Sequence, residues 1–438
     1  MKLFVSSTLV LLIAGAAFAQ TPRLSDQIVV TASAIPETIE STPASVTVIT
    51  KKQIDEQAAR DIADVLREVP GLTVSRSGSA GKATSLFTRG GDSTQTLVLW
   101  NGMEINNPYF SGYDWGRFST AGVSRVEVVR GPFSSLYGSE AMTGVINILT
   151  TPAATGMQAE VTGGGHGLRN GRLAGAYAGP ALQINGAIER REDAGFNPND
   201  DFRQTSADLL ARWNPSAAFS IGLAVRHTSY ALGIPFNLDA LGDALTASPR
   251  RRQNGSERQI ALPLQSALGR TSLELTLAES RRHDIFRDPQ DPSGFTDGNT
   301  ASTSRRARLV STTPTVAGTI VAGGEVERAV VDDSSSFGVN LDNNRRSARS
   351  LFVEDRWGAP IGGTRIELSA GTRYDRFTTF GGQTSPRLAI AWINIAASVY
   401  GAAPATVDEP PAPDLMLTAL EAIGAPDGNH ALLRTENA

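Results

Sequence analysis

The strongest constraint on the fold is a period of two residues that runs through most of the second half of the chain. Between residues 156 and 392, apolar and polar side chains alternate in one segment after another. In the stretch TRIELSAGTRY, residues 364–374, Leu368 and Tyr374 fall on one face of a strand and Glu367 falls on the other. Because successive side chains of a strand point to opposite faces, the pattern predicts many strands with one apolar and one polar face.

Connections of two lengths separate these segments. Short turns such as 214–216 alternate with long polar loops, which are predicted at residues 193–204, 239–256, 288–303 and 332–345. A soluble β-sandwich would show the same alternation of side chains. The many charges on the polar face and the two kinds of connection favour an antiparallel transmembrane β-barrel instead. The chain has no cysteine, and a large barrel needs no disulfides.

The N-terminus has the pattern of a signal peptide. Lys2 gives a short basic region, residues 9–16 are apolar, and Ala17-Phe18-Ala19 has the form of a cleavage site, which together predict a signal peptide over 1–19. A membrane anchor is the alternative, but the apolar run is too short and no charged stop follows it. Export is therefore predicted. The net charge of −4 gives no general reason to bind nucleic acid.

Residues 36–150 have a different pattern, that of a compact α/β domain. A helix is predicted at 58–69, ended by Pro70 and Gly71, and strands are predicted at 45–50, 96–100, 123–130 and 144–150. The predicted fold is an α/β domain over 36–150, followed by antiparallel barrel strands over 151–397.

The stretches that resemble catalytic motifs are incomplete. The stretch SAGKAT, residues 79–84, lacks the first glycine of a phosphate loop and has Ala83 where Ser or Thr belongs. The four histidines are scattered and have no metal-binding spacing. The absence of cysteine excludes thiol chemistry. The chain is predicted not to be an enzyme.

Three blocks in a consistent order resemble the TonB-dependent outer-membrane receptors, and within them the cobalamin-receptor branch. DQIVVTA at 26–32 is similar to the TonB box, TRGGDSTQTLVLWNGMEIN at 88–106 to the central plug motif, and VSRVEVVRGPFSSLYGSEAMTGVINILT at 123–150 to the closing plug motif. The resemblance implies a plug domain at 36–150 inside a barrel that normally has about 22 strands. It also implies an outer-membrane location, uptake of a large scarce nutrient, and TonB as the partner that pulls on the plug.

Residues 20–35 are predicted to hold the TonB box and a linker. The run has strong β-propensity, and Pro36 follows it, so no strand partner is expected within the chain. A free strand can add to the edge of another protein's sheet. An ordinary linker or a first plug strand is the alternative. The residues expected to contact TonB are Asp26, Gln27, Ile28, Val29, Val30, Thr31 and Ala32.

Arg89 and Arg130 stand at strand ends in the plug motifs, and each is followed by glycine. The resemblance implies that both face the barrel wall and pair with carboxylates there, as a lock that holds the plug and can be broken by pulling. The alternative is that they cap the sheet of the plug.

Ligand contact is expected from two outward plug loops, at 75–85 and 106–118. Exposed aromatic side chains offer apolar area with polar handles, which suits a bulky ligand. The alternative is that the aromatics pack the plug onto the barrel. Cobalamin is the first choice of ligand, and a ferric siderophore or haem is the second. The candidate residues are Ser79, Lys82, Asn106, Asn107, Tyr109, Phe110, Tyr113 and Trp115.

The acidic loop 197–201 holds Asp200 and Asp201. Its position coincides with a calcium-binding loop region of the cobalamin receptors, and clustered carboxylates can order such a loop around Ca²⁺. A solvated loop is the alternative. No other cofactor is expected.

Two features depart from the family pattern. Residues 151–397 accommodate about a dozen strands, roughly half of the usual wall. Residues 398–438 form an Ala- and Pro-rich tail without the final aromatic residue that the barrel assembly machinery reads. A truncated receptor is expected, and its unpaired edge in lipid would cost several kcal/mol per unsatisfied backbone group. If the barrel closes at this size, the plug is expected to lie outside it.

Three rival functions are weighed against energy-coupled uptake. A passive channel predicts neither a TonB box nor a plug. A receptor that signals to a sigma-factor regulator needs a further N-terminal domain, for which residues 20–25 leave no room. A non-transporting periplasmic plug fragment is the third, and outer-membrane fractionation distinguishes it from a transporter.

Overall fold

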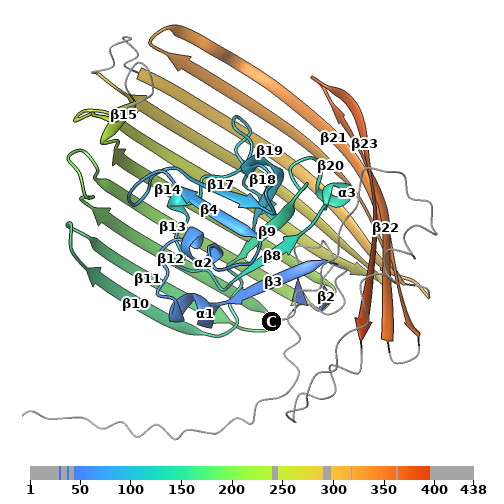
Figure 1. Ribbon diagram of the computed structural model, residues 1–438. Helices are drawn as coiled ribbons and strands as arrows, with labels where there is room; N and C mark the ends of the chain where they lie inside the picture. Colours follow the sequence, from blue (N-terminus) through green and yellow to red (C-terminus); the bar gives the residue numbers. More distant parts are fainter. Residues whose placement is uncertain are drawn as a thin grey trace, which may run out of the picture.

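The computed structural model describes residues 29–30, 37–38, 44–238, 245–289, 297–316, 318–361 and 364–394. The predicted signal peptide and the predicted tail at 398–438 lie outside these residues. Within them the chain forms a small mixed domain, here called the plug, and one large antiparallel sheet that curves around it (Figure 1). No helix among the described residues is long and apolar enough to cross a bilayer.

The plug is built on a five-stranded sheet. Strands β6 and β9 run parallel, and the other neighbours are antiparallel. All four strands predicted between 45 and 150 are present in this sheet, and its fifth strand, β7, was not predicted; neither were β4 and β5, which pair with each other outside it. The strand order is β3 (Ser45–Thr50), β8 (Arg125–Arg130), β9 (Gly144–Leu149), β6 (Thr96–Trp100) and β7 (Met103–Glu104).

The helix predicted over 58–69 is wrong in its bounds. Ala58 has a left-handed φ of 48°, which breaks the helical path, and Asp61 is extended and bridges to Ser119. Two short helices result, α1 (Lys51–Glu56) and α2 (Ile62–Leu66). The remaining plug elements are β4 (Leu72–Arg76), β5 (Thr84–Thr88), α3 (Ser134–Tyr137) and the 3₁₀ turns η2 (Ser93–Gln95) and η3 (Trp115–Arg117).

The large sheet has 12 strands, each antiparallel to its neighbours. No ladder joins β10 to β23 among the described residues, so this part of the sheet is open. The strands are, in order, β10 (Gly156–Gly163), β11 (Arg169–Ala178), β12 (Leu182–Asp193), β13 (Phe202–Ser216), β14 (Phe219–Gly233), β17 (Arg252–Leu268), β18 (Thr271–Arg287), β19 (Asp297–Pro314), β20 (Gly318–Ser335), β21 (Gly338–Ile361), β22 (Thr364–Phe377) and β23 (Gly381–Asn394).

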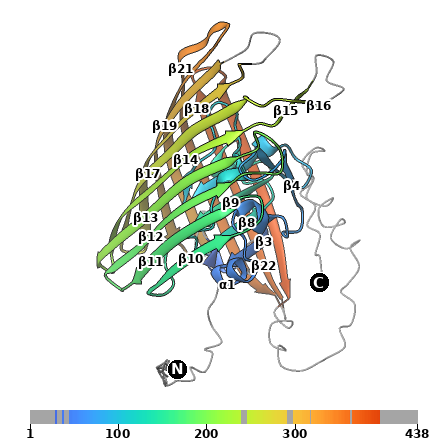
Figure 2. The same ribbon diagram turned by 90° about the vertical axis from the view of Figure 1, so that its left-hand side faces the viewer.

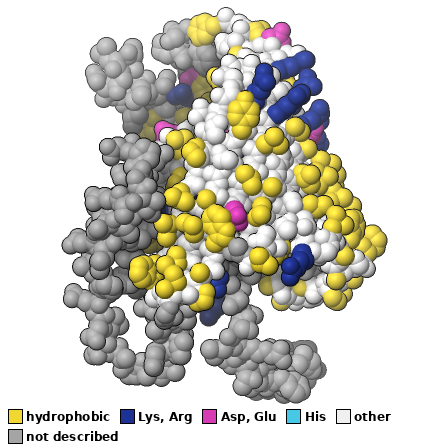
Figure 3. All heavy atoms as spheres, turned by 90° about the vertical axis from the view of Figure 1, so that its right-hand side faces the viewer, with side chains coloured by type: hydrophobic (Ala, Val, Ile, Leu, Met, Phe, Trp, Pro, Cys, Tyr) yellow, Lys and Arg dark blue, Asp and Glu magenta, His cyan; other side chains and the backbone are white. Residues whose placement is uncertain are grey.

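The two faces of this sheet are opposite in character to those of a soluble protein. On the outward face Leu351, Leu388 and Trp392 are 69%, 54% and 67% exposed. On the inward face Glu354 and Ser369 are fully buried. Figure 3 shows hydrophobic side chains spread over the outward side of the β21–β23 end. An apolar outside and a polar inside are the pattern of a barrel wall in lipid.

The plug lies on the concave, polar side of the open sheet (Figure 2). The sheet has two ends: one carries short turns, such as those between β13 and β14 and between β17 and β18, and the other carries the longer connections together with the tight turn between β20 and β21. The long-loop end includes the hairpin of β15 (Phe236–Leu238) and β16 (Leu245–Ala247). The loop predicted over 332–345 is wrong, because β20 and β21 continue through it to a tight turn at 336–337.

Candidate functional site

The predicted TonB-binding run is described at two residues. Val29–Val30 form β1, which pairs with β2 (Glu37–Thr38). The expectation that the run has no strand partner within the chain is therefore wrong at these two positions. This small sheet is separate from the five-stranded sheet of the plug. Asp26, Gln27, Ile28, Thr31 and Ala32 lie outside the described residues.

Among the described residues, three ion pairs that are buried or nearly so join the plug to the strands and loops of the large sheet. Arg306 of β19 donates both Nη atoms to the carboxylate of Glu104, at 2.7 Å each. The Nη1 atom of Arg191 in β12 lies 2.6 Å from Oδ1 of Asp61. On the plug side, Nζ of Lys82 lies 3.2 Å from Oδ1 of Asp200.

Burial perturbs the plug members of these pairs. It raises the pKa of Asp61 and the pKa of Glu104, although Arg191 and Arg306 oppose the shift. Burial also lowers the pKa of Lys82, against the effect of Asp200. Each pair therefore loses much of its gain to desolvation, and each group left without its partner would neutralise readily.

A second set of contacts holds the corner around α3. Arg308 and Arg373 both donate to the carbonyl oxygen of Leu136, at 3.0 and 3.1 Å. Arg387 of β23 donates from Nε to the carbonyl oxygen of Pro132 at 3.0 Å. A Cβ at Gly138, whose φ is 89°, would lie 3.4 Å from Arg373, so a side chain there would crowd this arginine.

Arginines of the sheet also stack on plug aromatics. Arg226, which is 1% exposed, lies 3.5 Å from the ring centroid of Phe118. Arg308 and Arg387 lie 4.7 and 4.6 Å from the ring centroids of Tyr137 and Phe133. The planar guanidinium group can stack flat on an aromatic ring while its N–H groups donate hydrogen bonds in its own plane.

Arg89 and Arg130 are placed differently from the expected lock. Arg130 donates to the carbonyl oxygen of Pro70 at 2.5 Å and to Oγ1 of Thr47 at 2.9 Å, both within the plug. Arg89 is exposed, with a left-handed φ of 51°. The alternative of a plug-capping arginine describes Arg130 better, and the observed ion pairs run mostly from sheet arginines to plug carboxylates.

Most of the predicted ligand residues are buried in the structure. Asn106 bonds the backbone of β6, accepting from Val98 N at 2.8 Å and donating to Thr96 O at 3.1 Å. Tyr113 and Trp115 are 8% and 2% exposed. For these two, the structure supports the alternative, in which aromatics pack the plug.

Ser79 and Lys82 both contact Asp200, which precedes β13 of the large sheet. Ser79 Oγ donates to Oδ1 of Asp200 at 2.6 Å, beside the Lys82 ion pair. Asn107 is also buried, and its Oδ1 accepts from the backbone N of Tyr109 at 2.9 Å. Tyr109 and Phe110 are the remaining candidates: Tyr109 is half-buried and Phe110 is 65% exposed at the tip of the loop.

Asp200 and Asp201 have cationic partners. Asp200 pairs with Lys82, and Asp201 accepts two hydrogen bonds from Arg252 at 2.9 and 2.8 Å, which hold the pKa of Asp201 below its usual range. Among the described residues, no three or more His, Cys, Asp or Glu side chains are grouped so that they could hold a metal ion. Calcium at this loop stays a prediction, and these pairings do not support it.

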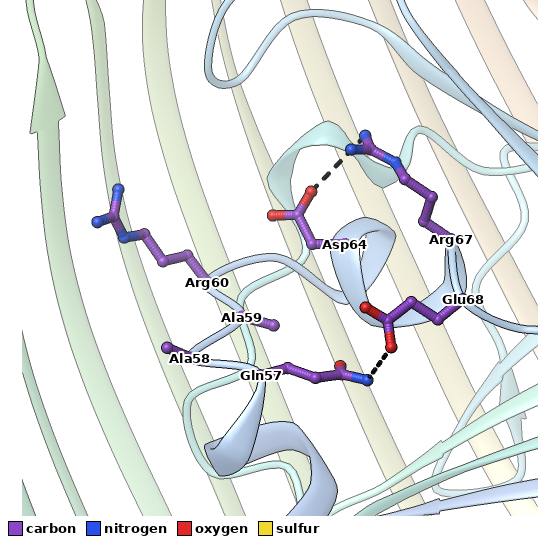
Figure 4. Close-up of a pocket in the computed structure, with 7 residues that line it drawn as sticks. All are labelled: Gln57, Ala58, Ala59, Arg60, Asp64, Arg67 and Glu68. Atoms are coloured by element: carbon purple, nitrogen blue, oxygen red, sulfur yellow. Dashed lines mark hydrogen bonds and ion pairs between the residues drawn. The ribbon is translucent and has the colours of Figure 1, made fainter.

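A pocket of about 360 Å³ lies beside α1 and α2 in the plug (Figure 4). Its polar groups pair with one another: Gln57 donates to Glu68 at 2.8 Å, and Arg67 lies 3.8 Å from Asp64. The Arg60 side chain points away from these pairs in Figure 4. The lining groups do not converge on a common point, so the pocket has no arrangement for a ligand.

Sequence comparison identifies both parts of this architecture. The family description "TonB-dependent Receptor Plug Domain" matches residues 38–145, and "TonB dependent receptor-like, beta-barrel" matches residues 149–427. The chain belongs to the TonB-dependent receptor family. The predicted fold, a plug domain followed by antiparallel barrel strands, is therefore confirmed.

Curated relatives include two vitamin B12 transporters, both named BtuB. The protein of Vibrio vulnificus is 37% identical over 187 residues, which are 42% of this chain and 30% of that protein. The protein of Photobacterium profundum is 38% identical over 162 residues, which are 37% of this chain and 27% of that protein. The matched segments thus span less than a third of each relative's length.

Solved structures of the family share the fold. The ferripyoverdine receptor of Pseudomonas aeruginosa superposes with a TM-score of 0.65 at 14% identity, over 82% of this chain and 56% of that one. The siderophore receptor PiuA of Acinetobacter baumannii gives a TM-score of 0.60 at 18% identity, over 81% and 62%. At these identities the likeness concerns the fold alone.

Proposed function

We propose that this receptor functions in TonB-dependent, energy-coupled uptake of cobalamin across the outer membrane. The single observation that carries the proposal is the plug itself: a separately folded domain sits on the polar side of a lipid-type wall and is held there by ion pairs and arginine contacts. A passive channel has no use for such a domain. The proposal includes no catalytic step.

The choice of cobalamin depends on sequence similarity. The curated relatives quoted above are named as vitamin B12 transporters, and they share 37–38% identity with this chain. Ferric siderophores are the alternative ligands to be tested, because the solved relatives are a ferripyoverdine receptor and a siderophore receptor. The short turns are proposed to face the periplasm, where TonB acts, and the long loops to face outside.

Equilibrium binding to the whole chain in outer membranes tests the ligand. Cyanocobalamin is expected to bind, and ferric pyoverdine and ferric citrate serve as competitors of another chemistry. Binding of a ferric chelate without binding of cyanocobalamin would contradict the choice of ligand and leave the receptor function standing.

The energised step has its own test. Val30→Pro removes a strand N–H donor from the proposed TonB-binding run, so energised uptake should be lost while cyanocobalamin binding remains. Glu40→Pro, outside residues 26–32, is the matched control and should take up ligand normally. Normal uptake by Val30→Pro would contradict docking of TonB at this run.

A further inference from the structure

Asp333, near the outer end of β20, connects four elements of the molecule. Its Oδ1 accepts from Thr300 Oγ1 of β19 at 2.6 Å. Its Oδ2 accepts from Asn340 Nδ2 of β21 at 2.7 Å and from the hydroxyl of Tyr109, in the plug, at 3.2 Å. Asp333 is 8% exposed, so this carboxylate is committed to three donors away from bulk water.

The backbone around Asp333 is irregular in a way that aims this side chain. Between the pairs Val331–Asn344 and Asp333–Leu341, β20 advances two residues while β21 advances three. Between Asp333–Leu341 and Ser334–Val339, the advances are one and two. The strand β21 therefore carries an extra residue on each side of the pair, and such bulges re-aim side chains next to functional sites.

The plug loop that meets Asp333 is fixed at its base and leaves its tip free. The backbone N of Asn107 donates to Gly112 O at 2.8 Å, and Asn107 O accepts from Ser111 N at 2.8 Å. Asn106 bonds the backbone of β6, and Tyr113 is buried. Between these points, the hydrogen bond to Asp333 joins Tyr109, near the tip, to the large sheet.

Phe110 depends on Tyr109 for its position. The two rings meet edge to face, with centroids 4.5 Å apart, and Phe110 is 65% exposed. Burial, with Asp333 adding to it, raises the pKa of Tyr109, so its hydroxyl keeps the donor proton at neutral pH. An exposed aromatic edge at the long-loop end offers apolar area to a large ligand.

We propose that Asp333 is a positioning residue for ligand recognition: by accepting the Tyr109 hydroxyl, it fixes the Tyr109–Phe110 pair as the apolar contact for a large cobalamin-class ligand. The ligand class rests on the proposed function, whereas the positioning role does not. Asp333 acts through Tyr109 and has no direct part in binding.

The first test needs no ligand. Because the chain has no cysteine, Phe110→Cys provides a single spin-labelling site in the whole protein. Label mobility should rise in Tyr109→Phe and in Asp333→Ala. It should stay unchanged in Asp332→Ala, since Asp332 is exposed and accepts from Asn343 N within the same hairpin. Unchanged mobility in both Tyr109→Phe and Asp333→Ala would overturn the positioning role.

The second test measures cyanocobalamin affinity without the label. Tyr109→Phe and Asp333→Ala should each weaken binding by about two- to tenfold, the effect of one hydrogen bond, and the double variant should be no weaker than either alone. Additive losses would contradict action through Tyr109. If the parent binds no cyanocobalamin, the ligand class fails together with the proposed function, and the mobility result still decides the role of Asp333.

Discussion

The interior of the plug and its contact with the large sheet are formed by different kinds of side chain. The interior is apolar: Ile62, Leu66, Trp100 and Ile148 have no exposed surface. The contact relies on buried ion pairs such as Arg306–Glu104 and on arginines that bond plug carbonyls. Burying an ion pair contributes little net stability, whereas each fully buried large apolar side chain contributes about 1.5–3 kcal/mol. The plug can therefore keep its fold while water replaces its contacts with the sheet.

The contact is not wholly polar. Leu210, Ala224 and Ala261 of the sheet pack against one side of the plug core, and Val321 and Phe352 against the other. Several of these side chains are small, so they add less apolar area than the interior holds. The two regions therefore differ in the proportion of apolar to charged contacts, and variants in each region test that difference.

The largest effect is expected in the plug interior. Trp100→Ala should lower the free energy of unfolding of the plug by about 3–5 kcal/mol, because it removes a fully buried side chain and leaves a cavity. Hydrogen exchange of the β6 and β9 amides measures this. Trp392→Ala is the control, since Trp392 is 67% exposed on the outward face and should leave plug exchange unchanged. Equal effects of the two variants would contradict a separate plug core.

The next effect is expected at the contact. Arg306→Met leaves the buried Glu104 carboxylate without its partner and should weaken docking by about 3 kcal/mol, the lower end for a broken buried pair, because Glu104 can take up a proton. A cysteine at Ala278, which lines the crevice beside this pair, reports docking as the urea midpoint for thiol pulse labelling.

Two further variants control this measurement. Adding Glu104→Gln should restore part of the loss, because it removes the unpaired charge. Arg305→Met changes a neighbouring arginine that is 63% exposed and pairs with Glu279, so the midpoint should not move. If the two arginine variants behave alike, the ion pair has no special part in docking.

A smaller, pH-dependent effect is expected at Glu140, where burial and the neighbouring Glu104 raise the pKa to about 8 from an ordinary 4.5. In the docked state Glu140 therefore binds its proton more tightly than a solvent-exposed carboxyl group does. This contribution is complete below pH about 4.5 and is lost as pH rises through about 8. The urea midpoint at the Ala278 cysteine should therefore fall as the pH rises from about 4.5 to about 8, and Glu140→Gln should flatten that fall. An unchanged slope in Glu140→Gln would assign the titration to another group.

The smallest effect is expected on the plug surface. Lys51 and Asp55 form an exposed pair on α1, with side chains 40% and 41% exposed. Lys51→Met should change plug stability by less than about 0.5 kcal/mol, measured by exchange of the same β6 and β9 amides. A loss as large as that of Trp100→Ala would show that exposed charge, and not burial, stabilises the plug.

The strands could be predicted from sequence because their signal is local. The alternation of Leu368 and Glu367 determines which face each occupies, and the structure places both as the pattern indicates, with Glu367 buried. The helix at 58–69 could not be bounded this way, because the bridge between Asp61 and Ser119 joins positions far apart in the sequence. A tertiary contact interrupted an otherwise helical pattern.

The contact residues are harder to find from sequence. Arg306 and Arg373 belong to the polar faces of predicted strands, but which plug groups they meet depends on docking. In the structure Arg308 both stacks on Tyr137 and bonds the carbonyl of Leu136, and the sequence gives no sign of either contact. Glu104 follows the turn at Asn101-Gly102, and no pattern in the sequence around it indicated that it would pair with an arginine of the sheet.

Native-state hydrogen exchange of the whole chain across a urea series tests the central claim most directly, namely that the contact opens more easily than the plug core. Amides of the α3 corner, such as Gly138, which donates to Ser134 O, should exchange through an opening of smaller free energy than the amides of β6 and β9. The same free energy and the same urea dependence at both places would contradict the account, because the plug and its contact would then open as one unit.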